Sequence, residues 1–189
     1  MSSHAIMSES VIARMLEYAQ TQPNVLDQAS FLAFIPLYLR NISYEDMLAY
    51  EQRDLYGALL NQWNLLERYK PGAVMLRVYN PTLDDDGWYS THTVVQLVIE
   101  DMPFLIDSMR MELNRLGITT HQMIFLGGMQ VIRDAGGRIT ELHPPTDLCS
   151  NCDILAPIHM EIDRQSDEGS LQQLYHDLMR VIKDRKSVV

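Results

Sequence analysis

The stretch VVQLVIEDMPFLIDSMRMELNRLG, from Val94 to Gly117, decides the fold because its hydrophobic period changes partway along. From Thr93 to Ile99 the side chains alternate with a period of two, and both alternating sets are largely apolar. This pattern predicts a central strand that is covered on both faces. From Ile106 to Leu116 the apolar residues recur at helical spacing, which predicts an amphipathic helix directly after the strand.

The ends of this predicted helix carry their own signals. Asp101 can cap the first turn through its carboxylate, and Pro103 follows where a missing N–H costs little. Gly117 supplies a left-handed stop, and the residues from Ile118 to Phe125 predict a second strand. The sequence therefore predicts a βαβ unit with an acid-x-Pro corner between its first strand and its helix.

The chain before this unit is predicted to be helical over its first ~70 residues. Four helices are expected. The first ends before Pro23, the second starts near Leu26 and ends or kinks at Pro36, the third is capped by Ser43, and the fourth runs from Asp54 to Pro71-Gly72.

The chain around and after the unit is predicted to be rich in strands. Strands are expected over 73–79, 129–133, 138–142 and 154–163, with a turn at Asp84–Gly87 and a last helix carrying Leu171 to Ile182. Pro157 predicts that the strand containing it is an edge strand or a bulged one, because proline cannot donate to a ladder.

Composition excludes several classes of protein. The chain has 189 residues, 47% of them hydrophobic and 21% charged, and a formal net charge of −10. This charge argues against binding to nucleic acid or to an anionic membrane surface. No apolar run approaches the ~20 residues of a membrane span, and the N-terminus lacks a secretory signal. We therefore expect a cytoplasmic protein.

Two groups of residues could bind a metal. Cys149 and Cys152 have the spacing of a zinc half-site, and His143 and His159 could complete four ligands. A lone half-site is a weak signal, so we expect free thiols and no metal. The acidic run Asp84–Asp86 lacks the spaced acids of a calcium loop, which favours a solvated turn.

A third group lies on one face of the predicted last strand. His159, Glu161 and Asp163 could bind a cation or perform acid–base chemistry, but polar alternation is also what a half-exposed strand requires. We favour a solvated face or an interface. The chain also lacks a G-x-G-x-x-G fingerprint and a lysine in an apolar, glycine-rich setting, so no catalytic or cofactor-binding residue is expected.

The acid-x-Pro corner and its surroundings resemble known proteins. Asp101-Met102-Pro103-Phe104-Leu105 followed by Leu116-Gly117-Ile118 resembles the first half of an ACT domain, a small ferredoxin-like regulatory module. The wider series is similar to the N-terminal region of the large bacterial NAD-specific glutamate dehydrogenases, from Asp54 to the end. Its segments are Arg77–Pro81, Asp86–Trp88, His92–Val95, Asp101–Ser108 and Glu161–Gln165.

The resemblance implies an α+β fold in which a helical segment, residues 1–70, precedes an ACT-like domain, residues 71–189. That domain would have a mainly antiparallel sheet covered by helices. Residues 73–79 could fill the place of the last strand of a βαββαβ module, or that strand could lie beyond Val189. The chain would then be an N-terminal fragment, inactive alone, of an enzyme that oxidises glutamate with NAD.

The resemblance also implies partners and a site. The expected partners are further copies of the chain, the catalytic part of the same enzyme and an amino-acid effector. The candidate regulatory or interface corner is Asp101, Met102, Pro103 and Phe104. Phe104 stands where the family usually has glycine, so we expect its ring to fill the ligand's space and to pack against this chain or a partner. The alternatives are a free-standing amino-acid sensor and a structural interaction module.

Overall fold

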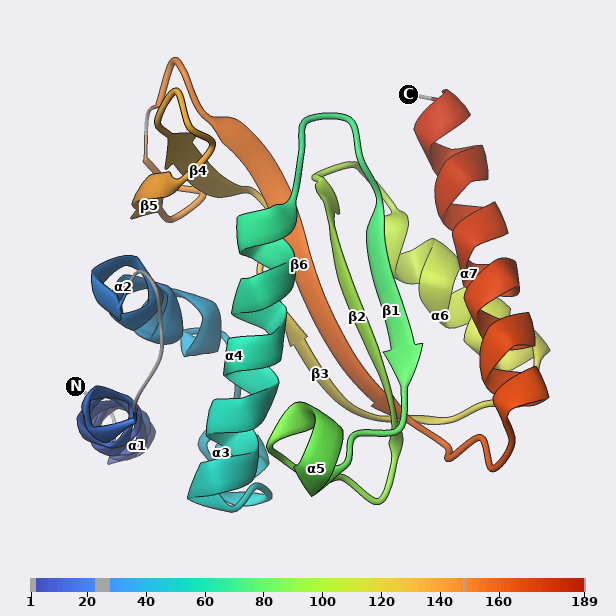
Figure 1. The fold of residues 1–189 in the computed structure, drawn as a ribbon, viewed down its shortest axis with the longest axis horizontal. Coiled ribbons are helices and arrows are strands. Elements are labelled where there is room, and N and C mark those ends of the chain that lie inside the picture. Colours follow the sequence, from blue (N-terminus) through green and yellow to red (C-terminus); the bar gives the residue numbers. More distant parts are fainter. Residues whose placement is uncertain (1–2, 23–27, 148, 189) are drawn as a thin grey trace.

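A six-stranded antiparallel sheet lies between two layers of helices in the computed structural model of the chain (Figure 1). The structure describes residues 3–22, 28–147 and 149–188. The elements in chain order are α1 (Ser3–Thr21), α2 (Gln28–Leu39), α3 (Tyr44–Leu48), α4 (Gln52–Arg68), β1 (Met75–Tyr79), α5 (Leu83–Asp86), β2 (Thr93–Glu100), α6 (Leu105–Arg115), β3 (Thr120–Phe125), β4 (Met129–Arg133), β5 (Ile139–His143), β6 (Asp153–Ile162) and α7 (Glu168–Val188).

The predicted βαβ unit is confirmed as β2, α6 and β3. Strand β2 is buried along its length except at Glu100, as a strand covered on both faces must be. Val95, Leu97 and Ile99 face α6 and α7, whereas Val98 faces the helices of the other layer. Both β2 and β3 pair antiparallel with β6, so they run parallel to each other with β6 between them. The α+β fold with an antiparallel sheet covered by helices is therefore confirmed.

Strand β1 completes the sheet of a βαββαβ module. It pairs antiparallel with β2, from Met75 opposite Val98 to Tyr79 opposite Val94. The strands β1, β2, β6 and β3 thus lie in the order that such a module has, with β1 in the place of its last strand. Of the two alternatives for that place, the strand near residues 73–79 is the one observed.

Strand β6 is an interior strand, so the prediction of an edge or bulged strand at Pro157 is wrong. One side of β6 pairs with β2 from Leu155 to Ile162, and the other side pairs first with β4 and then with β3. The carbonyl of Pro157 accepts the N–H of Leu126 on that second side. The N–H and C=O of a strand residue point to the same side. The N–H that Pro157 lacks would therefore face the gap between β4 and β3, where no strand needs it.

The N-terminal helices cover the sheet face that lies opposite α6 and α7 (Figure 1). Helix α2 continues through Pro36 to Leu39, although proline was expected to end or kink it, and the predicted start near Leu26 lies outside the described residues. Ser43 caps α3 as predicted by accepting the N–H of Asp46. These helices share one core with the sheet, and the division of the chain at residue 70 into two domains stays a prediction.

None of the helices in the described part of the chain is long and apolar enough to cross a membrane.

Candidate functional site

A buried polar cluster surrounds Glu161 near the end of β6. Its Oε1 accepts hydrogen bonds from the Tyr50 hydroxyl and, at 3.4 Å, from His159 Nε2. Its Oε2 accepts from Ser90 Oγ and lies 3.3 Å from His92 Nδ1. A carboxylate offers about four acceptor positions, and four polar groups of the chain surround this one. The cluster thereby joins β6 to the loop between α3 and α4 and to the loop before β2.

A second set of polar residues holds His159 on the side away from Glu161. Gln96 Nε2 donates to the Ala58 carbonyl at 3.1 Å and lies 3.1 Å from His159 Nδ1, while the Tyr79 hydroxyl donates to Gln96 Oε1. The amide nitrogen of Gln96 therefore faces His159 Nδ1, and Glu161 lies at the other ring nitrogen, so the imidazole is held from both sides.

Glu161 is held ionised by its donors. Burial by itself raises the pKa of this carboxyl, but the hydrogen bond and the electrostatic attraction of His159, together with hydrogen bonds from Ser90 and Tyr50, outweigh burial and lower the pKa to about 2. Burial and the nearby carboxylate raise the pKa of Tyr50 well above its ordinary value, so its hydroxyl keeps the proton that it donates. The cluster is thus an ionised carboxylate surrounded by hydrogen-bonding groups.

The prediction of a solvated strand face is wrong for His159 and Glu161, and an interface with another chain stays a prediction. His159 is 1% exposed and Glu161 3% exposed, because this face of β6 lies under α4 and the two loops. Asp163 alone is exposed, and it pairs with His121 at 2.7 Å. The pattern of a single strand could not reveal the cluster, since its other members come from the loops and from β2. Those members are Tyr50, Ser90, His92 and Gln96.

A cleft of about 270 Å³ opens beside the cluster. Its polar wall includes Tyr89, Ser90 and Glu161, and the rings of His92 and His121 stack there with their centroids 4.3 Å apart. Within the described part of the chain, no group of three or more His, Cys, Asp or Glu side chains could hold a metal ion. Because polar groups of this chain already surround Glu161, the arrangement favours a structural role that fixes the two loops.

The predicted corner, Asp101 to Phe104, lies at the opposite end of β2 and differs from the prediction in two ways. Asp101 is not the N-cap of α6. Its carboxylate lies beside Gly127 and Gly128, and α6 starts at Leu105 with Phe104 as its N-cap. The Phe104 ring is 65% exposed, so its expected packing against this chain is wrong. Packing of the ring against a partner stays a prediction.

Phe104 has φ 61°, which is left-handed backbone that a non-glycine residue adopts at a cost. Replacing it with glycine is therefore expected to raise the free energy of unfolding by roughly 0.5–1 kcal/mol, because relief of the backbone exceeds the entropy that glycine adds. Thermal melts measure this change. Phe104→Ala is the matched control, since it removes the exposed ring but keeps the strained backbone. A lower melting temperature for Phe104→Gly than for Phe104→Ala would contradict the expectation.

The cysteine loop does not assemble the four metal ligands that its spacing allowed. Cys149 and Cys152 are both free, and His143 pairs with Glu141 at 3.0 Å and with Asp147 at 3.4 Å. His159 belongs to the buried cluster, seven residues further along than Cys152, so it is roughly 20 Å away. A hydrogen bond with Cys149, together with burial, raises the pKa of Cys152 to about 11, which disfavours the reactive thiolate.

The acidic run forms the single helical turn α5, where only a turn was expected. Thr82 caps it, and Gly87 ends it at φ 76°, as the predicted turn required. Asp84 and Asp85 are exposed, whereas the Asp86 side chain is buried against Arg77 Nη2 at 2.5 Å. Asp86 is therefore part of an ion pair and not of a fully solvated turn.

Comparison with known proteins adds sequence evidence. Residues 34–178 match the family described as glutamate dehydrogenase, ACT1 domain. A protein of Halomonas elongata named NAD-specific glutamate dehydrogenase is 32% identical over 179 residues, which are 95% of this chain and 11% of that protein. A Pseudomonas aeruginosa protein of the same name is 35% identical over 148 residues, 78% of this chain and 9% of that protein. The chain thus spans a small part of the length of each relative. No solved structure matches.

Proposed function

We propose that this chain, which belongs to the glutamate dehydrogenase ACT1 domain family, is the regulatory and assembly region of an NAD-specific glutamate dehydrogenase. The names of both relatives support this proposal. The whole enzyme would convert L-glutamate, NAD⁺ and water to 2-oxoglutarate, ammonium, NADH and a proton. These 189 residues would supply neither the NAD site nor the catalytic groups.

The observation that carries a non-catalytic role is the enclosure of Glu161 in the buried cluster. Four polar groups of this chain surround the Glu161 carboxylate, so little room is left there for a substrate. The cluster connects Tyr50, next to the helical layer, with β6 in the centre of the sheet. Such a connection supports a regulatory region, because it fixes the helical layer to the sheet and can pass a conformational change between them.

The arrangement of the sheet supports assembly through its edges or through helices. Helices cover both faces, so a second copy cannot pack directly on the sheet (Figure 1). Within the described residues, β1 pairs only with β2 and β5 pairs only with β4, which leaves one edge of each strand unpaired. Unpaired edges are templates for strand addition, so we propose them as sites of contact with further copies or with the rest of the enzyme.

The test compares the chain with its parent enzyme. We expect the purified 189-residue chain to show no glutamate-dependent NAD reduction and no heat on titration with NAD, whereas the full-length enzyme shows both. Micromolar affinity of the chain for NAD would contradict the absence of a cofactor site. Deleting the region from the enzyme is expected to change the oligomeric mass or the response to amino-acid effectors. If neither changes, the regulatory and assembly role is wrong.

A free-standing amino-acid sensor is the second proposal. The corner at Asp101 supports it, because the carboxylate lies beside Gly127 and Gly128 and desolvation there raises its pKa. Amino-acid titrations of the chain that shift the resonances of this corner would favour a sensor.

A further inference from the structure

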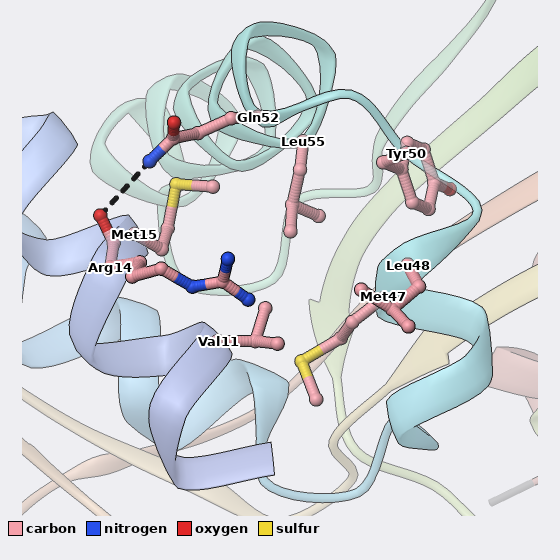
Figure 2. A pocket seen from close by; sticks show the side chains of 8 residues that line it. All are labelled: Val11, Arg14, Met15, Met47, Leu48, Tyr50, Gln52 and Leu55. Carbon is pink, nitrogen blue, oxygen red and sulfur yellow. Dashed lines mark hydrogen bonds between the residues drawn. The ribbon is translucent and has the colours of Figure 1, made fainter. Parts of the chain in front are cut away.

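An apolar pocket of about 160 Å³ lies where α1 meets α3 and the start of α4 (Figure 2). It is separate from the Glu161 cluster, although Tyr50 contributes to both: its ring lines the pocket and its hydroxyl points away to Glu161. The lining side chains are Val11, Arg14, Met15, Met47, Leu48, Tyr50, Gln52 and Leu55.

The apolar part of this pocket suits a small hydrocarbon group. An engineered protein cavity of about 150 Å³ binds benzene, so a space of this size accepts a group of roughly four to six carbons. Met15, Met47 and Leu55 are each 2% exposed, so the wall that they form is already excluded from water. Methionine side chains are flexible and polarisable, which lets such a wall adapt to its occupant.

Arg14 gives the pocket a single positive charge. Its guanidinium extends from α1 into the pocket, between Met47 and Leu55 (Figure 2). Among the described residues, no carboxylate lies within ion-pair distance of Arg14, whereas Arg77 and Arg115 each pair with an acid of this chain. Guanidinium and carboxylate form strong bidentate pairs, so an unpaired guanidinium beside an apolar wall matches a ligand carboxylate.

The start of α4 adds further donors to the same rim. This 17-residue helix begins at Gln52, and its N-cap residue, Glu51, makes no side-chain capping bond. Gln52 Nε2 donates to the Arg14 carbonyl at 3.1 Å and so connects the two sides of the rim (Figure 2). Asp54, the acid in this first turn, faces the other way, where it accepts from Arg53 and from the N–H of Tyr89. The positive end of the helix therefore favours an anion at the rim.

We propose that this pocket binds a small monocarboxylate with an apolar tail of roughly four to six carbons. The carboxylate pairs with Arg14, and the tail lies between Met15, Met47 and Leu55. Dicarboxylates such as glutamate and 2-oxoglutarate are excluded, because their second charge would be buried against the apolar wall without a partner. The site is thus distinct from any site for the substrates of the parent enzyme, and its existence does not depend on the regulatory role.

Three probes with one tail and different head groups test the proposal: isocaproate, isohexanol and isohexylamine. The readout is the NMR spectrum of the 189-residue chain with isotope-labelled methionine methyl groups. Isocaproate is expected to shift the methyl signals of Met15 and Met47 and to leave that of Met111, which is 70% exposed on α6, unchanged. The alcohol is expected to bind at least tenfold more weakly, and the amine more weakly still.

Two arginine variants separate the contribution of the Arg14 charge to binding from that of the apolar pocket wall. Arg14→Met is expected to lower the affinity for isocaproate at least tenfold, to that of isohexanol, and to leave the alcohol unaffected. Arg110→Met, which removes an exposed arginine from α6, is the matched control and should bind isocaproate like the wild type. Arg14 is exposed, so its variant should keep the wild-type melting temperature. Equal binding of acid and alcohol, undiminished acid binding by Arg14→Met, or no shift at about 10 mM isocaproate overturns the proposal.

Discussion

Replacing Glu161 with glutamine is expected to lower the free energy of unfolding by roughly 3 kcal/mol at neutral pH. The donors of the cluster lower the pKa of this carboxyl from 4.5 to about 2, and each pKa unit corresponds to about 1.4 kcal/mol. The residue is 3% exposed, so solvent screens little of this energy. Glutamine also brings an NH₂ group, which would face a donor, His159 or Ser90, in place of an acceptor.

The effect should depend on pH in one direction. The folded-state pKa of Glu161 lies below its value in the unfolded chain, so the ionised carboxylate stabilises the fold above about pH 4.5. This contribution is lost progressively as the pH falls from there towards about 2. The difference in stability between wild type and Glu161→Gln should therefore shrink over that range and stay constant above it.

Urea denaturation, followed by the fluorescence of the buried Trp63 and Trp88, measures both effects. Asp163→Asn is the matched control, because Asp163 is another carboxylate near the end of β6 that pairs with a histidine, His121, but is exposed. Its effect should be much smaller. If Glu161→Gln and Asp163→Asn have the same stability at neutral pH, the buried cluster does not carry the energy assigned to it.

The local elements could be predicted because their causes are local. The change of period at Thr93–Leu116 predicts β2 and α6, since a strand and a helix bury different spacings of the same apolar residues. The Ser43 cap and the stop at Gly117 depend on a few neighbouring residues and are also observed. These elements are fixed by contacts within a few positions along the chain.

The features that could not be predicted depend on contacts between distant residues. Pro157 in isolation indicates an edge, but the two-sided pairing of β6 comes from three other strands. Glu161 alternates like a solvated residue, and only the fold brings Tyr50 and Ser90 to it. The exposure of Phe104 likewise depends on where the backbone leaves β2, which no pattern of side chains reports.

The second large effect is expected at Gly57, where α4 makes its closest approach to the loop before β2. A Cβ atom added at Gly57 would lie 2.3 Å from Cβ and 2.6 Å from Cγ of Trp88. Trp88 is fully buried, with Tyr79 and His159 on its ring at centroid distances of 6.4 and 6.0 Å. Because Trp88 Cβ is fixed to the backbone, no rotamer change relieves the contact, and α4 or the loop must move.

Gly57→Ala is therefore expected to destabilise the fold by roughly 3 kcal/mol, at the upper end of the cost of overpacking, and to lower the melting temperature by about 6–12 °C. A loss of stability would be diagnostic of the close contact, because alanine in a helix is otherwise favoured over glycine by about 1 kcal/mol. Gly169→Ala, in the first turn of α7, is the matched control. Its added Cβ would meet only Oδ1 of the Asp167 carboxylate, at 3.2 Å, a contact that a shift of a few tenths of an ångström relieves, so its loss of melting temperature should be far smaller than that of Gly57→Ala. If both variants are as stable as the wild type, α4 does not pack against Trp88 as closely as described.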